Sequence, residues 1–293
     1  MALTMPFDKF SGQFKYVDEA ADDHFAILSN KGLRELCNHM LEQHTEDTFK
    51  LNVHKFKAEL DKGLFFESNI PQGFGLGSSG ALVAAIFLRY LEKAGDFKDG
   101  IKSMTKEKMG SVKRYLGGLE GFFHGTSSGI DPLSILINEP ILLKSANDIT
   151  CVEVPEFKAD GKNVIFLLNT GLARNTDKLV DKFKASCEDS QFRSKMECEL
   201  IAATNGSIQS FLDKDDKSLY QNLEQLVKFQ FEEMNYLIPN AFNQHVIEGM
   251  EHGDYFLKIC GSGGGGYMLG FTENWELTQE KLKKDEIEIL YRF

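Results

Sequence analysis

The sequence lacks an excess of basic residues and lacks any long apolar run. Lysine and arginine total 33 against 44 aspartate and glutamate residues, so the formal net charge of the 293-residue chain is -11. Binding along a nucleic-acid backbone needs a surplus of lysine and arginine, which argues against a nucleic-acid partner. A membrane-spanning helix needs about 20 consecutive apolar residues, and the apolar run at residues 81–88 is far shorter. We therefore predict a protein that binds neither nucleic acid nor a membrane.

The cysteines and histidines also lack the spacings of metal and disulfide frameworks. Five cysteines are scattered along the chain without a C-x-x-C pair, and the seven histidines contain no H-E-x-x-H. An odd, scattered set of cysteines is typical of free thiols in a reducing compartment, so we predict a cytoplasmic protein. The pattern G-x-x-x-x-G-K-[ST] is absent as well, which excludes a P-loop nucleotide site.

Patterns of apolar residues predict a mixed α+β protein. The length allows one large domain or two of ordinary size, and the polar segment 155–162 is the best candidate boundary. We therefore predict an N-terminal domain over residues 1–157 and a C-terminal domain over residues 158–293. The spacing of Phe25, Leu28, Leu33 and Leu36 predicts a helix over residues 20–44. Further helices are predicted at 81–92, 105–123, 176–188, 192–212, 217–233, 240–251 and 278–284. Strands are predicted at 51–53, 63–67, 140–143, 149–154, 164–168, directly before the glycine-rich residues 261–266, and at 267–271 and 287–291.

A glycine-rich stretch, Pro-Gln-Gly-Phe-Gly-Leu-Gly-Ser-Ser-Gly, occupies residues 71–80 and leads into the apolar run at 81–88. A glycine-rich turn that opens a helix directs backbone N–H groups and the positive end of the helix dipole at one point, which suits a phosphate. Gly75 and Gly77 permit a close backbone approach and a positive φ, and Ser78 and Ser79 add hydroxyls. A tight turn before a buried helix explains this stretch equally well when it is considered alone.

Two stretches, residues 75–80 and 261–266, match the pattern G-x-G-x-x-G. A Rossmann fold needs a hydrophobic strand directly before this motif and a βαβ crossover after it. Pro71 and Gln72 interrupt the approach to the first stretch, and a predicted strand follows the second one. We therefore disfavour dinucleotide binding.

A third stretch combines Glu120 and Asp131 with His124 and a turn bracketed by Gly125 and Gly129. Two carboxylates in such a setting can divide their tasks, one holding a metal while the other accepts a proton. Taken alone, a solvated helix end followed by an N-cap explains the same residues. The joint order of the three stretches is what makes the pattern specific.

In that order the three stretches resemble the GHMP small-molecule kinases, a family named for galactokinase, homoserine kinase, mevalonate kinase and phosphomevalonate kinase. The first and third glycine-rich stretches are similar to the family's second and third motifs. The run His-Gly-Thr-Ser-Ser-Gly-Ile-Asp at 124–131 and the run Asn-Thr-Gly-Leu-Ala-Arg-Asn-Thr at 169–176 resemble the mevalonate kinases most. The resemblance implies an α+β fold with a ribosomal protein S5 domain 2-like N-terminal domain and a ferredoxin-like C-terminal domain.

The resemblance also implies an activity, the phosphorylation of mevalonate to 5-phosphomevalonate by ATP and Mg²⁺ in isoprenoid biosynthesis. Asp131 would be the catalytic base that takes the proton from the acceptor hydroxyl. Ser79 and Glu120 would hold Mg²⁺, a cation suited to oxygen ligands. The residues implied to bind ATP are Gly73, Gly75, Leu76, Gly77, Ser78, Ser79, Gly261, Gly263, Gly264 and Thr176.

Three more residues fit the family pattern less specifically. Arg174 and Lys258 are candidate cations near the phosphates, and a simple surface role is the alternative for each. For His124, stabilisation of the turn is favoured over a role in catalysis. A homodimer is left open.

One departure from the family pattern concerns the N-terminal end. The family's first motif, a strand with a lysine, has no counterpart ahead of Ala2, and Lys9 and Lys15 are not placed to replace that lysine. We therefore expect a chain that is short by a strand and a turn at this end. Three alternatives stay open: another GHMP kinase such as phosphomevalonate kinase, an N-terminally truncated ATP-binding protein with little turnover, and a regulatory sugar-binding relative.

Overall fold

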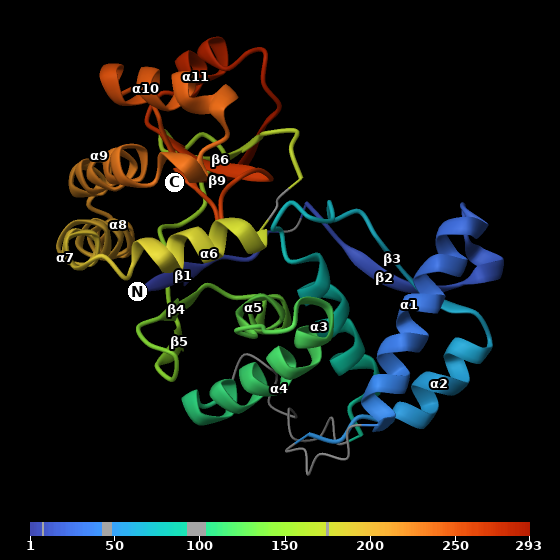
Figure 1. Ribbon diagram of the computed structural model, residues 1–293. Helices are drawn as coiled ribbons and strands as arrows, with labels where there is room; N and C mark the ends of the chain where they lie inside the picture. The colour runs from blue at the N-terminus through green and yellow to red at the C-terminus, as the bar shows by residue number, and fades with distance from the viewer. Residues whose placement is uncertain (8, 43–48, 93–103, 174–175) are drawn as a thin grey trace. The chain divides into compact units, whose positions relative to one another are not determined.

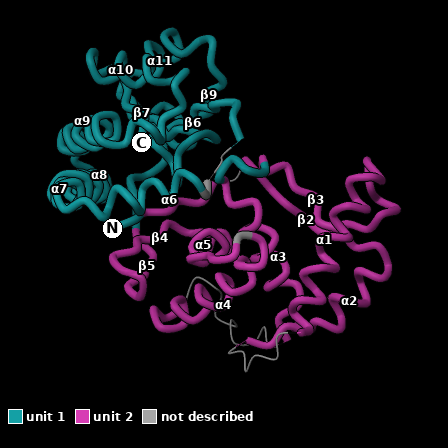
Figure 2. Tube along the Cα trace, viewed as in Figure 1, with its two compact units in different colours: residues 1–2, 72–75, 153–293 teal, residues 3–71, 76–152 magenta. Residues whose placement is uncertain are grey.

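The computed structural model describes residues 1–7, 9–42, 49–92, 104–173 and 176–293 (Figure 1). The chain forms two compact units, which Figure 2 colours separately. Unit 1 comprises residues 1–2, 72–75 and 153–293, and unit 2 comprises residues 3–71 and 76–152. Both units combine helices with strands, so the prediction of an α+β protein is confirmed. The predicted domain limits, 1–157 and 158–293, stay a prediction.

In its described residues, unit 2 has five α-helices and two small sheets. Its helices are α1 (Asp23–Glu42), α2 (Val53–Asp61), α3 (Ser78–Tyr90), α4 (Lys106–His124) and α5 (Ile130–Ile137). Its strands are β1 (Ala2–Thr4), β2 (Gly12–Tyr16), β3 (Leu64–Ser68), β4 (Ile141–Leu143) and β5 (Ile149–Cys151). The first residue of β1, Ala2, counts with unit 1. One sheet pairs β2 with β3, and the other has the order β1-β4-β5. Strand β2 was not among the predicted elements.

Helix α3 is buried on two faces, which explains the nearly continuous apolar run at residues 81–88. On one face, Val83 and Phe87 belong to a core cluster that also contains Leu133 of α5. On another face, Ile86 and Tyr90 join a second cluster built with α1, α2 and β3. Helices α3, α4 and α5 pack against one another (Figure 1). This packing holds the N-terminus of α3, where the first glycine-rich stretch lies, in a fixed position.

Residues 51–53 do not form the predicted strand. Leu51 makes only an isolated antiparallel bridge with Leu91. The side-chain oxygen of Asn52 accepts a hydrogen bond from the N–H of Lys55 at 2.9 Å, so Asn52 caps α2 and the helix begins at Val53. The alternation of apolar residues suggested a strand. The stronger local signal is the asparagine, whose side chain accepts a hydrogen bond from a backbone N–H in the first turn of α2.

Helix α1 departs from the predicted apolar face in its first half. Leu33 and Leu36 are buried as expected. Phe25 and Leu28 are exposed by 39% and 55%, although the spacing placed them on the same apolar face. The spacing of apolar residues shows which of them share a face of the helix. How much of that face is covered depends on where the neighbouring elements β3 and α2 end.

In the described part of the chain, no helix combines the length and hydropathy needed to cross a bilayer.

Unit 1 contains a four-stranded antiparallel sheet with the strand order β7-β8-β6-β9. Its strands are β6 (Val164–Asn169), β7 (Phe256–Ile259), β8 (Tyr267–Thr272) and β9 (Ile287–Arg292). Its helices are α6 (Thr176–Ser186), α7 (Ser190–Lys195), α8 (Ile201–Asp213), α9 (Asp216–Glu233), α10 (Asn243–His252) and α11 (Trp275–Lys281), with a π-helical turn at Met196–Leu200. Helices α8 and α9 pack together, and α9 and α10 pack on β7. This order of strands and helices is the ferredoxin-like split βαβ topology, as predicted.

Candidate active site

The first glycine-rich stretch ends at the N-terminus of α3. Gly77 is the N-cap and has a φ of 74°, a left-handed conformation that favours glycine, and Ser78 is the first residue of the helix. The first N–H groups of a helix have no partner within it, and the helix dipole adds positive potential there. A helix end of this kind suits an anion, and phosphate binding at this stretch stays a prediction. Leu76 and Ser79 flank this N-cap in unit 2, whereas Gly73 and Gly75 count with unit 1.

The N-terminus of α5 lies directly against the N-terminus of α3. Gly129 is the N-cap of α5, and Asp131 lies in its first turn with an exposed side chain. A Cβ atom placed on Gly80 would lie 3.0 Å from the Cβ of Asp131 and 3.0 Å from the backbone nitrogen of Pro132. The absence of a side chain at Gly80 thus permits the close approach of the two helices. The fold brings Asp131 beside the glycine-rich stretch, as the proposed roles of both require.

Glu120 and Ser79 form the second part of the site. Glu120 lies near the end of α4 and is only 5% exposed. Its Oε1 atom accepts a hydrogen bond from Ser79 Oγ at 2.8 Å. Two ligands of one Mg²⁺ ion in adjacent octahedral positions lie about 2.9 Å apart, given the usual Mg–O distance. The separation and the chemistry of this pair therefore fit a shared Mg²⁺ ion.

A single carboxylate with a hydroxyl is a sparse ligand set. Among the residues that the structure describes, no group of three or more histidine, cysteine, aspartate or glutamate side chains could hold a metal ion. Mg²⁺ is usually bound through one or two carboxylates together with substrate phosphates and water. The pair of Ser79 and Glu120 suits an ion that arrives with a phosphate-bearing ligand.

The turn before Asp131 is fixed by close backbone contacts with α4. Gly129 has a φ of 71°, and a Cβ atom on it would lie 2.0 Å from the carbonyl oxygen of Lys113. A Cβ atom on Gly117 would lie 3.1 Å from the backbone nitrogen of Gly129. Ser127 adds a side-chain link, because its Oγ accepts a hydrogen bond from the N–H of Gly129 at 3.0 Å. Ser127 could not be predicted as a site residue from the sequence, because its link depends on residues that only the fold brings near.

In unit 1, the second glycine-rich stretch is tied to the loop between β6 and α6. The N–H of Gly266 donates to the carbonyl of Leu172 at 2.6 Å, and the hydroxyl of Thr170 donates to the carbonyl of Gly266 at 2.7 Å. The N–H of Gly264 donates to the carbonyl of Leu237 at 2.7 Å. The described part of one predicted stretch, residues 169–173, is thus brought together with another, residues 261–266. Thr170, which is 8% exposed, was part of the predicted run 169–176 but was given no role of its own.

The remaining predicted residues of unit 1 are placed as follows. Thr176 begins α6, the helix that follows this loop. The Nζ of Lys258 donates to the carbonyl of Ile259 at 3.0 Å, so its ammonium contacts its own strand. Arg174 and the side chain of His124 lie outside the described residues.

The beginning of the first glycine-rich stretch has its own contacts in unit 1. A Cβ atom on Gly73 would lie 3.9 Å from the Cβ of Ala173. The ring of Phe74 lies 5.8 Å, centroid to centroid, from the ring of Tyr267. Residues 72–75 therefore contact both the loop that leads to α6 and the residue that follows the second glycine-rich stretch.

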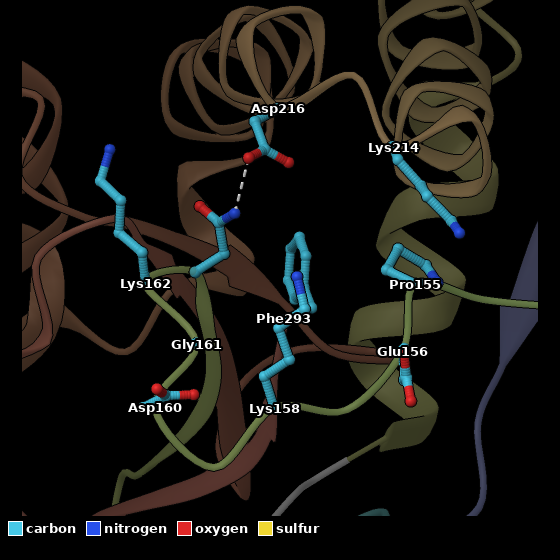
Figure 3. Close-up of a pocket in the computed structure, with 10 residues that line it drawn as sticks. Pro155, Glu156, Lys158, Asp160, Gly161, Lys162, Lys214, Asp216 and Phe293 are labelled. Carbon is cyan, nitrogen blue, oxygen red and sulfur yellow. Dashed lines mark hydrogen bonds between the residues drawn. The ribbon is translucent and has the colours of Figure 1, made fainter.

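A hollow of about 550 Å³ in unit 1 is lined by residues that include none of the predicted site residues (Figure 3). Asn163 and Asp216 meet in it through a hydrogen bond from Nδ2 to Oδ2 of 2.8 Å. Three lysines and three acidic residues line it, namely Lys158, Lys162, Lys214, Glu156, Asp160 and Asp216. This balance provides no excess positive charge for a phosphate, so the candidate site is assigned to the ends of α3, α4 and α5.

A family model matches the part of the chain that carries this site. Residues 34–136 match the model of the GHMP kinases N terminal domain, a span that includes Ser79, Glu120 and Asp131. No curated protein sequence matches the chain.

Solved structures match nearly the whole chain. The L. major mevalonate kinase in complex with R-mevalonate has a TM-score of 0.63 at 14% identity, covering 98% of this chain and 87% of that one. The Lin0012 protein from Listeria innocua has a TM-score of 0.57 at 17% identity, covering 94% and 79%. The Streptococcus pneumoniae phosphomevalonate kinase in complex with phosphomevalonate and AMPPNP has a TM-score of 0.56 at 12% identity, covering 96% and 89%. At these identities the likeness establishes a shared fold.

Proposed function

We propose that this chain, which has the α+β fold of the GHMP kinases and matches that family's N-terminal domain over residues 34–136, transfers phosphate from ATP to a small-molecule alcohol. The observation that carries the proposal is the meeting of three features at one place in unit 2. The N-termini of α3 and α5 lie together, Ser79 and Glu120 form an oxygen pair beside them, and Asp131 lies in the first turn of α5. Together these features supply anion binding, a cation site and a proton acceptor.

Each part of the site has a role in this proposal. Backbone N–H groups at Ser78 and Ser79 donate to phosphate oxygens at the start of α3. Ser79 and Glu120 hold Mg²⁺, which when bound would neutralise phosphate charge. Asp131 accepts the proton of the acceptor hydroxyl as that oxygen attacks the γ-phosphate. Because Asp131 is exposed at the helix ends, an acceptor can reach its carboxylate.

Unit 1 contributes the second group of predicted residues. Gly261, Gly263 and Gly264 are proposed to steady the phosphate-binding stretch, and Thr176 to contact the reacting phosphates. The hydrogen bonds of Thr170 and Gly266 hold the stretches 261–266 and 169–173 together, so both can act as one rigid piece.

Mevalonate is the acceptor that we propose, with 5-phosphomevalonate as the product of an isoprenoid pathway. The motif resemblance at residues 120–131 and 169–176 supports it, as does the likeness to a mevalonate kinase solved with R-mevalonate. Phosphomevalonate is the second candidate, because a phosphomevalonate kinase shares the fold. An acceptor with its own phosphate would favour basic residues near Asp131, but the sequence has no lysine or arginine between Arg114 and Lys144.

A nucleotide-binding protein without turnover is the alternative from another functional class. The family's first motif contributes a lysine, and Lys15 does not supply a free one, because its ammonium forms an ion pair with Glu67 across the β2–β3 sheet. Such a protein would bind Mg-ATP and release no ADP with any alcohol.

The test is ADP release from Mg-ATP with mevalonate, with phosphomevalonate, homoserine and galactose as parallel acceptors. We expect ADP release with mevalonate only, and none from an Asp131→Asn variant. Release with phosphomevalonate alone would replace the proposed acceptor. No release with any of the four, together with Mg-ATP binding by calorimetry, would identify a binding protein instead. Absence of Mg-ATP binding would overturn the proposed function.

A further inference from the structure

Ser127 makes two hydrogen bonds that join separate parts of the candidate site. Its hydroxyl donates to Oε2 of Glu120 at 2.5 Å and accepts the N–H of Gly129 at 3.0 Å. A serine hydroxyl has one hydrogen to donate and lone pairs to accept with, so one side chain can do both. Ser127 thereby connects the carboxylate near the end of α4 to the N-cap of the helix that carries Asp131.

The two oxygens of Glu120 are held by two different serines. Oε1 accepts from Ser79, and Oε2 accepts from Ser127. Within the described part of the chain, no lysine, arginine or histidine forms an ion pair with Glu120. The terminal torsion of a glutamate is intrinsically broad, so donors on both oxygens are what fix the plane of this carboxylate. Two hydroxyls, not a basic group, thus orient a carboxylate that is 5% exposed.

Which oxygen faces Ser79 therefore depends on Ser127. A Mg²⁺ ion needs near-ideal octahedral geometry, so a carboxylate that rotates loses affinity for it. Groups that orient metal ligands from behind typically change metal affinity by about 10- to 100-fold when they are removed. The Gly129 bond adds a second effect, because it fixes the turn from which Asp131 projects.

We propose that Ser127 is a positioning residue that orients Glu120 for Mg²⁺ and couples the metal pair to the start of α5. This inference rests on the proposed function, in which Ser79 and Glu120 hold Mg²⁺. Ser127 itself contacts neither the acceptor nor the phosphates in this proposal. It acts through Glu120 on the cation and through Gly129 on the placement of Asp131.

The experiment measures the Mg²⁺ dependence of ATP binding by titration calorimetry on the full chain, with thermal melting in parallel. In Ser127→Ala we expect the half-saturating Mg²⁺ concentration to rise by about tenfold or more. Ser127→Thr, which keeps the hydroxyl, should restore the wild-type value. The matched control is Ser111→Ala on α4, whose hydroxyl bonds back to the Glu107 carbonyl, and it should leave the Mg²⁺ dependence unchanged.

A double variant, Ser127→Ala with Glu120→Gln, distinguishes an effect of Ser127 through Glu120 from a general disturbance of the fold. If Ser127 acts through Glu120, Ser127→Ala should add nothing to the Mg²⁺ dependence in a Glu120→Gln background. An unchanged Mg²⁺ dependence in Ser127→Ala, with a changed one in Glu120→Gln, would overturn the role of Ser127 and leave the proposed function standing. A wild-type chain that binds ATP without any Mg²⁺ dependence would overturn both. Should Ser127→Ala not fold, Ser127→Cys, which keeps a weaker donor, must show an intermediate rise or the proposal fails.

Discussion

The two carboxylates of the candidate site differ in their surroundings, and this difference supports the separate roles proposed for them. Asp131 is exposed in the first turn of α5, where the helix dipole stabilises a negative charge. Glu120 is 5% exposed and receives hydrogen bonds from two serines. An exposed carboxylate can exchange a proton with an arriving alcohol, whereas a buried and oriented one suits a fixed cation. At the residue scale, this difference supports the proposed roles of Asp131 as base and Glu120 as metal ligand.

Substitution of the proposed base tests this assignment. Asp131→Asn keeps the size of the side chain and its place in the first helical turn, but it removes the proton acceptor. We expect kcat to fall by about 10²- to 10⁴-fold, the usual contribution of a general base, with ATP affinity within a few-fold of wild type. Steady-state kinetics and calorimetry measure the two quantities. Asp213→Asn, at the end of α8, is the control, and full turnover in Asp131→Asn would refute the role of Asp131.

At the scale of elements, the site depends on how closely the turn before α5 approaches α4. Gly129 combines a left-handed φ of 71° with a distance of 2.0 Å from a built Cβ atom to the Lys113 carbonyl oxygen. No larger residue fits without moving one of the two backbones. Gly118, which lies on α4, has nothing within 4 Å of a built Cβ atom. A side chain is therefore excluded at Gly129 and tolerated at Gly118, although the two glycines lie on neighbouring segments.

Two alanine substitutions should consequently have opposite effects on stability. Gly129→Ala should lower the free energy of unfolding by about 2–5 kcal/mol, from backbone strain and overpacking. Gly118→Ala should raise it by about 0.5–1 kcal/mol, because alanine is the better helix former. Denaturant unfolding followed by circular dichroism measures both. If the two substitutions changed the free energy of unfolding equally, the close approach of Gly129 to the Lys113 carbonyl would be contradicted.

Helices α2 and α3 are joined by a small network around one carboxylate. Tyr90 and Arg89 of α3 donate to the same Oε2 atom of Glu59 on α2, at 2.6 and 2.9 Å. Burial opposes ionisation of Glu59, but the hydrogen bonds from Tyr90 and Arg89 outweigh it and hold the pKa of Glu59 below its ordinary value of 4.5. The ionised carboxylate is thus stabilised by folding.

This network predicts a pH dependence of stability. A carboxylate whose pKa is lower in the folded state contributes its full stabilisation above the unfolded pKa, and loses it as the pH falls through the folded value. Glu59→Gln should therefore lower the free energy of unfolding at pH 7 by about 1–3 kcal/mol. In this variant the free energy of unfolding should also decrease less steeply than in wild type as the pH falls below about 4.5. Urea unfolding at several pH values measures this. The control Glu35→Gln, exposed on α1, should leave the decline as in wild type.

At the scale of the whole molecule, ligand binding should be visible as stabilisation. A ligand at 100 times its Kd, bound only by the folded state, adds about 2.7 kcal/mol. With Mg-ATP we expect Tm to rise by about 5–10 °C, and by less with ATP and a chelator, because Glu120 and Ser79 would then lack their cation. Scanning fluorimetry measures both conditions. A shift that is the same with and without Mg²⁺ would contradict the proposed metal pair.

Most of the element pattern could be predicted because its causes are local. Residues 164–168 form a continuous apolar run, and they became the buried strand β6 at Val164–Asn169. Thr105 caps α4 with its hydroxyl, which accepts from the N–H of Lys108 at 3.3 Å, close to the predicted start. The predicted strand at 51–53 was wrong, because the Asn52 cap outweighed two alternating apolar residues. Strand β2 escaped prediction because only its pairing with β3 defines it.

The sequence by itself determined the spacing of glycines, serines and carboxylates, and with it the resemblance to GHMP kinases, because motif order survives where overall identity is low. Only the tertiary structure decided that Ser79 reaches Glu120, that Ser127 holds the other oxygen of that carboxylate, and that Gly80 lets Asp131 approach α3. These contacts join segments from three helices. Their distances depend on how α3, α4 and α5 pack through a shared apolar core, which no local pattern in the chain specifies.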